Sequence, residues 1–368
     1  MMTESPNKDP KWIAGVKPPA EMLNMSMIGI YERECREQPW RLAELIRAYS
    51  HDSAVLEELN KLRHIASNAG PILFLGMGAS YCSSIVGSVW LQSCGRSSFF
   101  ADAGEWLHYS MPVWDQVGGS ILTTASGESA ELVQLCRNNP GNPLALICNN
   151  EKSACWSLVH QRLPILAGPE YGNATKTYTN ATAACIILAS HLAGRSWQDH
   201  ADRLLDTYEN TLNHVFDLRH QLEDFCRGAR NIELIGRGPT YGSAIMGALC
   251  IREMAGNRAA PHSGAGFRHG PLLDVSNSHV AIIFALGRGA ELGLKLAQDC
   301  NARGGKVILV SAEDHPPSEK FLPVKLHEVS EPWESLTSIL VPQSLTLGMI
   351  EQHGANLRPR FQYGTMEE

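Results

Sequence analysis

Four hydroxyl side chains lie within positions 123–129, where the sequence reads T-T-A-S-G-E-S. The apolar run G-G-S-I-L precedes them, and A-E-L-V-Q-L-C-R, which has helical spacing, follows them. The hydroxyls therefore fall where a predicted strand turns into a helix. They either cap the free N–H groups of the first helical turn or, together with that helix N-terminus, form a cradle for an anion such as a phosphate ester.

A duplication within the chain helps to separate these two interpretations. Residues 74–92 and 234–252 share a pattern at a constant offset, since 236 − 76 and 247 − 87 both give 160. The recurring residues of the first copy are Gly76, Gly78, Tyr81, Ser83, Ile85 and Gly87. Gly127 falls on Gly287 at the same offset, so the chain consists of two copies of one unit of about 150 residues.

The two copies differ in their hydroxyl groups. The first has Ser80 in one loop and Thr124, Ser126 and Ser129 in the other, whereas the second has Thr240 and the stretch L-G-R-G. If these groups only capped helices, both copies would need them equally. The asymmetry favours a phosphate site in the first copy alone.

The elements that must position these loops alternate between strands and helices. In the first copy, P-I-L-F-L-G, S-I-L-T-T and L-A-L-I-C-N read as strands that are each followed by a helix, and the second copy repeats this order. The pattern predicts an α/β fold with parallel sheets covered on both faces, in which ligands bind at the carboxyl ends of the strands. The loop G-M-G-A-S-Y lacks the third glycine of a dinucleotide-binding loop, so we expect no NAD or FAD.

Composition excludes several classes of protein. The net charge of −7 argues against nucleic acid as a partner. No apolar run reaches the roughly 18 residues of a membrane span, and the first residues lack the apolar core of a signal peptide. The ten cysteines form no C-x-x-C pair and lie mostly in apolar segments, which is typical of reduced thiols in a cytoplasmic protein. Histidines and cysteines do not cluster with ligand spacing, so we expect neither a metal nor another cofactor.

Six segments together resemble the sugar isomerase (SIS) family, in the double-domain arrangement of the isomerase half of glucosamine-6-phosphate synthase. They are G-M-G-A-S-Y (76–81), T-T-A-S-G-E-S (123–129), Y-E-R-E-C-R-E-Q-P (31–39), G-N-A-T-K-T-Y-T (172–179), A-L-C-I-R-E (248–253) and F-R-H-G-P (267–271). The resemblance implies two tandem SIS domains, each a doubly wound parallel sheet in a flavodoxin-like three-layer sandwich. We expect an N-terminal arm at 1–50, domains at 51–200 and 201–353, and a tail at 354–368.

The resemblance also implies roles for individual residues. Ser80, Thr124, Ser126 and Ser129 would bind the phosphate. Weaker contacts with the substrate would come from Gly78, Ala79, Ala125, Gly127, Thr175 and Lys176, although Lys176 is equally consistent with an ion pair to a carboxylate. Glu253 matches the glutamate that moves a proton between C1 and C2 of an open-chain sugar, with a helix-end glutamate as the simpler alternative. His269 matches the ring-opening histidine that the neighbouring subunit donates, and the alternative is a histidine at a helix end.

Two departures from the family bear on the reaction. The sequence shows no glutaminase part with its N-terminal cysteine, and Gly364 stands where the family has a tail lysine that forms a covalent imine. We therefore expect a cytoplasmic homodimer, with His269 shared across the interface, that acts on a phosphorylated sugar or sugar–amine conjugate. Deamination, deglycation and simple isomerisation remain open as the reaction. The alternative from another class is a sugar-phosphate sensor, which would keep the hydroxyl loops and dispense with Glu253 and His269.

Overall fold

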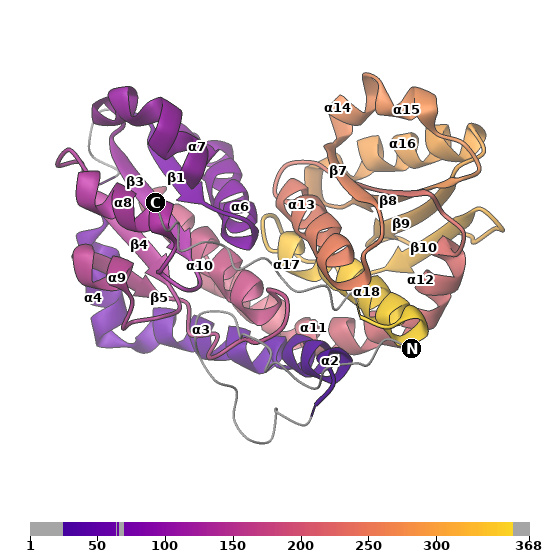
Figure 1. Cartoon of the computed structure of the whole chain (residues 1–368), viewed down its shortest axis with the longest axis horizontal. Coiled ribbons are helices and arrows are strands. Elements are labelled where there is room, and N and C mark those ends of the chain that lie inside the picture. Colours follow the sequence, from indigo (N-terminus) through magenta and orange to yellow (C-terminus); the bar gives the residue numbers. More distant parts are fainter. Residues whose placement is uncertain (1–24, 64, 66–69, 356–368) are drawn as a thin grey trace, which may run out of the picture.

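The computed structural model describes residues 25–63, 65 and 70–355, and it divides into two lobes that each contain one sheet (Figure 1). The expected contacts of the N-terminal arm before residue 25 and of Gly364 lie outside the described residues. Every strand pair is parallel, and the orders are β2-β1-β3-β4-β5 and β10-β9-β8-β6-β7. The strands are β1 (Ile72–Gly76), β2 (Ser98–Asp102), β3 (Gly119–Thr124), β4 (Leu144–Cys148), β5 (Gln161–Pro164), β6 (Asn231–Gly236), β7 (Ala259–Ser263), β8 (His279–Ala285), β9 (Lys306–Ser311) and β10 (Phe321–Lys325).

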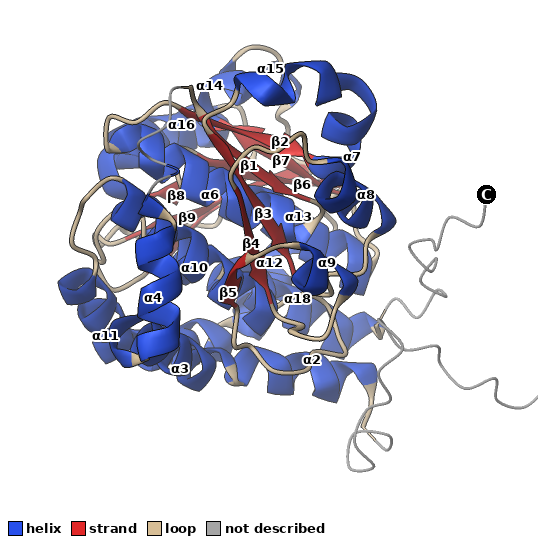
Figure 2. Cartoon of the chain, turned by 90° about the vertical axis from the view of Figure 1, so that its left-hand side faces the viewer, coloured by secondary structure: helices blue, strands red, loops and turns tan. Residues whose placement is uncertain are grey.

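Helices connect the strands and cover both faces of each sheet (Figure 2). In the N-terminal half they are α2 (Met27–Arg36), α3 (Gln38–His51), α4 (Ser53–Lys61), α6 (Ala79–Ser93), α7 (Ala103–Glu105), η2 (Trp106–Ser110), η3 (Met111–Gln116), α8 (Ala130–Asn138), α9 (Ala154–Leu158) and α10 (Lys176–Leu192). In the C-terminal half they are α11 (Gln198–Asp217), α12 (Arg219–Cys226), α13 (Thr240–Cys250), η4 (Ile251–Ala255), α14 (Gly264–Arg268), α15 (Pro271–Asp274), η5 (Gly287–Gly289), α16 (Ala290–Ala302), α17 (Glu334–Ser338) and α18 (Leu340–His353). Helix α11 runs across the expected division at 200/201.

The predicted duplication and α/β fold are confirmed. Strands β3 and β8 begin at 119 and 279, helices α8 and α16 at 130 and 290, and strands β5 and β10 at 161 and 321, so each pair is 160 residues apart. Both sheets have the same order once β1 to β5 are matched with β6 to β10. This is the 2-1-3-4-5 order of flavodoxin-like folds, in which the order reverses next to the first strand.

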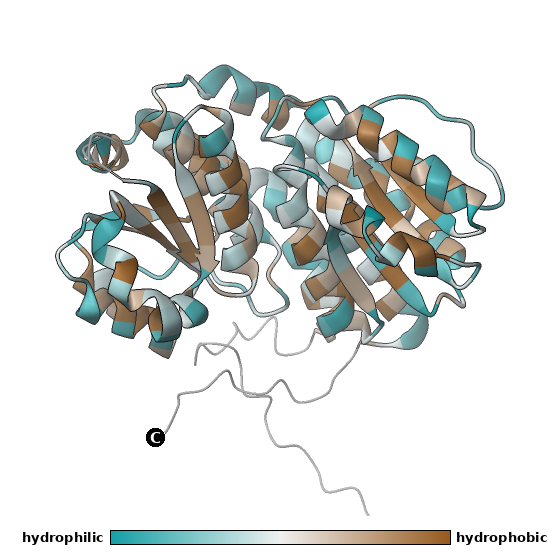
Figure 3. Cartoon of the chain, turned by 90° about the horizontal axis from the view of Figure 1, so that it is seen from above, coloured by the Kyte–Doolittle hydropathy of each residue, from teal (hydrophilic) through white to brown (hydrophobic). Residues whose placement is uncertain are grey.

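The strands are buried because both faces of each sheet are covered. In β1, Ile72 and Phe74 join one hydrophobic cluster, whereas Leu73 and Leu75 join another, as the alternation of side chains along a strand requires. In Figure 3 the strands carry mainly hydrophobic colours, and the outer helices show more hydrophilic ones. The outer face of each sheet has its own cluster, and the inner faces of both sheets share a single large one. The shared core fixes the two units against each other.

Helices α6 and α13, which are equivalent in the repeat, pack together at the junction of the units. A Cβ at Gly242 would lie 2.7 Å from the carbonyl oxygen of Cys82, so only glycine permits this approach. The close packing brings the end of α13 towards the first unit. That end leads directly to Glu253.

Candidate active site

The first hydroxyl loop joins β1 to α6. Gly78 has a φ of +54°, which favours glycine, and it precedes the helix without supplying a side-chain cap. The first N–H groups of α6 are therefore open to an anion at a helix N-terminus. Ser80 lies in this first turn, half-buried, and its hydroxyl makes no hydrogen bond with any residue that the structure describes.

The second hydroxyl loop joins β3 to α8. Thr124 Oγ1 accepts a hydrogen bond from Gly127 N (3.1 Å), and Ser126 Oγ accepts one from Glu128 N (3.2 Å), so both hydroxyls help to fold the loop. Ser129 occupies the N-cap position of α8, yet its side chain makes no capping hydrogen bond. Capping therefore does not account for Ser129, and its hydroxyl remains available beside the helix N-terminus.

These two loops are neighbours in space. Strand β1 pairs with β3, with Ile72 opposite Gly119, so the loops after both strands lie at the same carboxyl edge of the first sheet. The chain leaves β1 towards β2 on one side and continues through β3 to β5 on the other, which makes this edge the topological switch point of the sheet. The structure thus brings Ser80 together with Thr124, Ser126 and Ser129 at the place where such sheets bind ligands.

A third loop, 165–175, follows β5 at the same edge and is held by helices α2 and α3. The backbone N–H groups of Tyr171 and Gly172 donate to the two carboxylate oxygens of Glu34 at 2.5 and 2.9 Å. Lys176 is buried and pairs with Glu37. Burial acts to raise the pKa of Glu37, but the hydrogen bond and charge of Lys176 outweigh it and hold that pKa below its usual value. The Y-E-R-E-C-R-E-Q-P segment thus supports this loop.

Two weaker candidates in the third loop already have partners within the protein. Thr175 donates its hydroxyl to Glu170 at 2.9 Å, and its N–H donates to the same oxygen at 2.9 Å. Of the two interpretations of Lys176, the structure contains the ion pair, because its ammonium group contacts Glu37. Both residues thus contribute to the shape of the loop.

Glu253 reaches the first unit from the second. It lies in η4, which continues α13, and its Oε2 accepts a hydrogen bond from Asn173 Nδ2 at 2.8 Å. Asn173 is 1% exposed and belongs to the third loop of the first sheet. A carboxylate from one unit thus lies against a loop at the ligand edge of the other. This contact is the main feature that connects the two halves of the predicted site.

Cys250 lies next to the same contact. Its Sγ is 3.9 Å from Asn173 Oδ1, so Asn173 lies between the thiol and the Glu253 carboxylate. Burial, followed by the negative charge of Glu253, raises the pKa of Cys250 well above its ordinary value. The thiol is therefore neutral and is a poor nucleophile. Glu253 is the group at this contact that can exchange a proton.

His269 lies at the opposite edge of the second sheet from Glu253. It is exposed and follows α14, which begins directly after the carboxyl end of β7. Glu253 comes shortly before the amino end of β7, after a helical run that starts at Thr240 and spans about 20 Å at 1.5 Å per residue. His269 and Glu253 of the same chain therefore do not form one site.

Asn173, Glu34 and Glu37 were missed as site residues by the sequence analysis. All three lie in segments that resemble known motifs, which was the only signal in the sequence. Their contacts join positions 139 or 80 residues apart, as in Lys176 to Glu37 and Asn173 to Glu253. No local spacing rule predicts such contacts.

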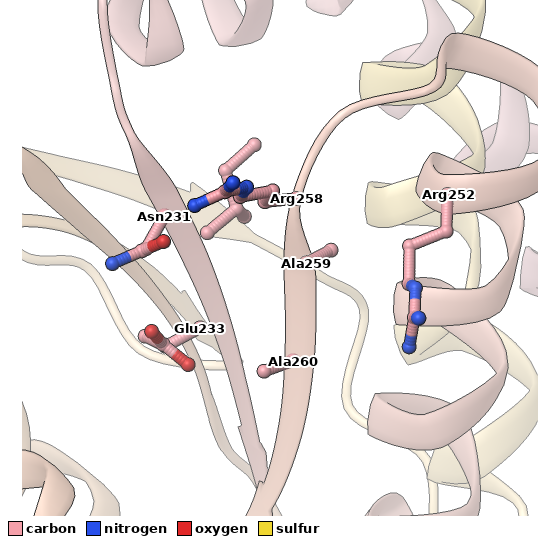
Figure 4. Close-up of a pocket in the computed structure, with 7 residues that line it drawn as sticks. Asn231, Glu233, Arg252, Arg258, Ala259 and Ala260 are labelled. Carbon is pink, nitrogen blue, oxygen red and sulfur yellow. The ribbon is translucent and has the colours of Figure 1, made fainter.

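A hollow of about 240 Å³ lies at the amino edge of the second sheet (Figure 4). Asn231 and Glu233 line it from β6, and Arg252 lines it from η4. It contains none of the predicted phosphate-binding or catalytic residues. Within the described part of the chain, no group of three or more histidine, cysteine or acidic side chains could hold a metal ion, and no helix is long and apolar enough to cross a membrane.

Comparison with known proteins agrees with this architecture. Residues 226–349, which include β6 to β10, match the SIS domain family. This part of the chain is a SIS domain. Its strand order and helix positions are those of the first unit, offset by 160 residues.

The SIS domain belongs to a chain that is homologous to the SIS portion of larger enzymes. It is 29% identical over 295 residues to glutamine–fructose-6-phosphate aminotransferase (isomerizing) of Zymomonas mobilis, covering 77% of this chain and 49% of that protein. It is 28% identical over 357 residues to the protein of the same name from Pyrococcus horikoshii, covering 92% of this chain and 58% of the relative. The chain thus spans about half the length of these relatives.

Solved structures share the fold of both units. The C-terminal domain of glucosamine-fructose-6-phosphate aminotransferase from Francisella tularensis has a TM-score of 0.78 at 20% identity, covering 89% of this chain and 97% of that one. Glucosamine-6-phosphate deaminase from Thermotoga maritima has a TM-score of 0.70 at 18% identity, also covering 89% of this chain and 97% of that one. At these identities the likeness establishes the fold alone.

Proposed function

We propose that this protein is an enzyme that binds a phosphorylated sugar, or a sugar–amine conjugate, at the carboxyl edge of the first sheet. The phosphate would lie between the N-termini of α6 and α8, where Ser80 and Ser129 have free hydroxyls. Thr124 and Ser126 would present the backbone of the second loop. The names of the aminotransferase relatives support a sugar phosphate as the substrate class.

The observation that carries the proposal is the contact between Glu253 and Asn173. It joins a carboxylate of the second unit to a ligand-edge loop of the first at 2.8 Å. A carboxylate in this position can take a proton from one carbon of an open-chain sugar and return it to the neighbouring carbon. Asn173 would hold the Glu253 side chain in one orientation during both steps.

The reaction that this arrangement serves best is proton transfer between C1 and C2. Its products then follow from the substrate: an aldose or ketose phosphate is isomerised, an amino sugar phosphate loses ammonia, and a fructosamine phosphate releases an amine. We favour the last two, because no segment among positions 25–355 supplies the glutaminase part of the longer relatives.

His269 would act from a second copy of the chain. In its own chain it is exposed at the far edge of the second sheet, about a helix length from Glu253. An exposed imidazole that titrates near neutrality suits ring opening in a neighbouring subunit. The complete site would then require a homodimer with two equivalent interfaces.

The substrate is tested by incubating the protein with glucosamine 6-phosphate, fructosamine 6-phosphates and fructose 6-phosphate, with assays for ammonia, free amine and hexose phosphate. Glu253→Gln should abolish turnover and keep substrate binding. Glu209→Gln, which makes the same change on the exposed face of α11, should leave both unchanged. Tight binding without turnover of any substrate would instead identify a sugar-phosphate sensor.

The dimer is tested by subunit mixing. Glu253→Gln and His269→Asn should each be inactive, and refolding them together should restore about one quarter of the activity, since half of the dimers are mixed and each contains one intact site. Mixed dimers without activity would show that His269 does not act across the interface.

A further inference from the structure

A second cavity, of about 690 Å³, lies at the carboxyl edge of the second sheet. The residues that line it come from the loops after β8, β9 and β10 and include Arg288, Glu313, His315, Glu331 and Glu334. Its volume is within the range of small-molecule sites. It contains none of the residues assigned to the proposed sugar-phosphate site.

The position of this cavity follows from the duplication. Gly287 is the counterpart of Gly127, and both have left-handed φ values, +54° and +67°. The loops after β8, β9 and β10 therefore correspond to those after β3, β4 and β5, which form much of the proposed phosphate site. The chemistry has changed, because the counterparts of Thr124, Ser126 and Ser129 are Phe284, Leu286 and Gly289. A phosphate ester would find no hydroxyl cradle here.

Glu334 is the residue of this cavity that lacks a partner. It is 2% exposed, it lines the cavity, and its Oε2 has no hydrogen bond to any residue in the described part of the chain. Burial, followed by the charge of Glu331, raises the pKa of Glu334 to about 8. A buried carboxyl group without a partner is costly to the fold, and a bound cation would offset that cost.

The charges around Glu334 also favour a cation. Five carboxylates line the cavity, those of Glu291, Glu313, Glu328, Glu331 and Glu334, against the single guanidinium of Arg288. Arg288 is already engaged, because its Nε donates to Glu331 Oε2 at 2.5 Å and its backbone N–H donates to Glu331 Oε1 at 2.8 Å. The remaining carboxylates do not converge as metal ligands, since the described residues contain no metal-binding group of three.

We propose that this cavity binds a small organic molecule that bears an ammonium group, and that Glu334 is its ion-pair partner. The site is separate from the proposed sugar-phosphate site and does not depend on it. The ammonium group would donate to Glu334 Oε2, and the outer carboxylates would attract the cation over longer distances.

Calorimetric titration of the full-length protein tests this inference. Ethanolamine and glucosamine serve as ammonium probes, with ethylene glycol and glucose as their neutral counterparts, at constant ionic strength. We expect the amines to bind and the neutral molecules not to bind. Glu334→Gln should weaken amine binding by roughly tenfold to a hundredfold, because a charge-assisted hydrogen bond is lost. Glu319→Gln, an exposed residue outside the cavity, should not change it.

Other outcomes would overturn the inference. Absence of binding by both amines, or equal binding of glucose and glucosamine, would remove the case for an ammonium site. Amine binding that is lost in Ser126→Ala with Ser129→Ala, and kept in Glu334→Gln, would place the amine in the first site instead. The latter result would leave the proposed sugar-phosphate function intact.

Discussion

Replacing Asn173 with aspartate should raise the pKa of Glu253 and shift the pH dependence of the enzyme. Asn173 Nδ2 donates to Glu253 Oε2 at 2.8 Å and is buried, so the variant puts a second carboxylate beside the first with little change in shape. Two unit charges about 4 Å apart repel each other by about 4 kcal/mol at an effective dielectric constant of 20. One pKa unit corresponds to 1.36 kcal/mol, so we expect the pair to hold one proton up to a pH about two to three units higher.

The assay is the pH profile of kcat/KM on the substrate identified above. Its acidic limb, where the base becomes protonated, should move to higher pH by about two to three units in Asn173→Asp. Asn138→Asp adds the same charge at the exposed end of α8 and should leave the profile in place.

Urea unfolding gives a second measurement that needs no substrate. A folded-state pKa above the unfolded value means that the folded protein binds more protons, so stability falls as pH rises between the two values. Asn173→Asp should therefore lose stability relative to the wild type as pH rises from about 4 to about 7. A folded variant with unchanged profiles in both experiments would refute the assignment of Asn173 as the residue that positions Glu253.

Further predictions concern both ligand edges. Ser129→Ala should weaken binding of the sugar phosphate about tenfold and change the unfolding free energy by less than about 0.5 kcal/mol, because this hydroxyl makes no capping bond; calorimetry and urea unfolding measure the two quantities. Gly127→Ala should destabilise the fold by about 2–5 kcal/mol, because φ is +67° and the new Cβ would clash with Ser153 Oγ; a loss under 1 kcal/mol in urea would contradict this. Glu334→Gln should gain stability relative to the wild type as pH rises from 4.5 to about 8, with an upper limit of about 5 kcal/mol, because the wild-type folded state retains a proton that the unfolded state releases; a pH-independent difference would contradict this.

Much of the fold was predictable because its signals are local. Buried parallel strands read as short apolar runs, and the offset of 160 residues appears in single glycines such as Gly127 and Gly287. The hydroxyl loops were predictable for the same reason, since Ser80 and Thr124 each follow a recognisable strand. The parallel arrangement then requires both loops to lie at one edge.

The partners of individual side chains were not predictable in the same way. Ser129 has the sequence position of a helix cap, yet its hydroxyl makes no capping bond. Thr175 and Lys176 were predicted to contact substrate, whereas Glu170 and Glu37 engage them within the protein. Such contacts depend on the packing of α2 and α3 against a distant loop, which no spacing in the sequence encodes.

The sequence by itself determined two α/β units and the presence of hydroxyl groups in the first, because periodicity and repetition are properties of the chain. Only the tertiary structure decided that Glu253 meets Asn173, that His269 lies at the opposite edge, and that the second unit keeps a cavity with a buried Glu334. The physical reason is that the shared core between the inner faces of the two sheets fixes how the units pack, and that packing brings together residues far apart in the chain.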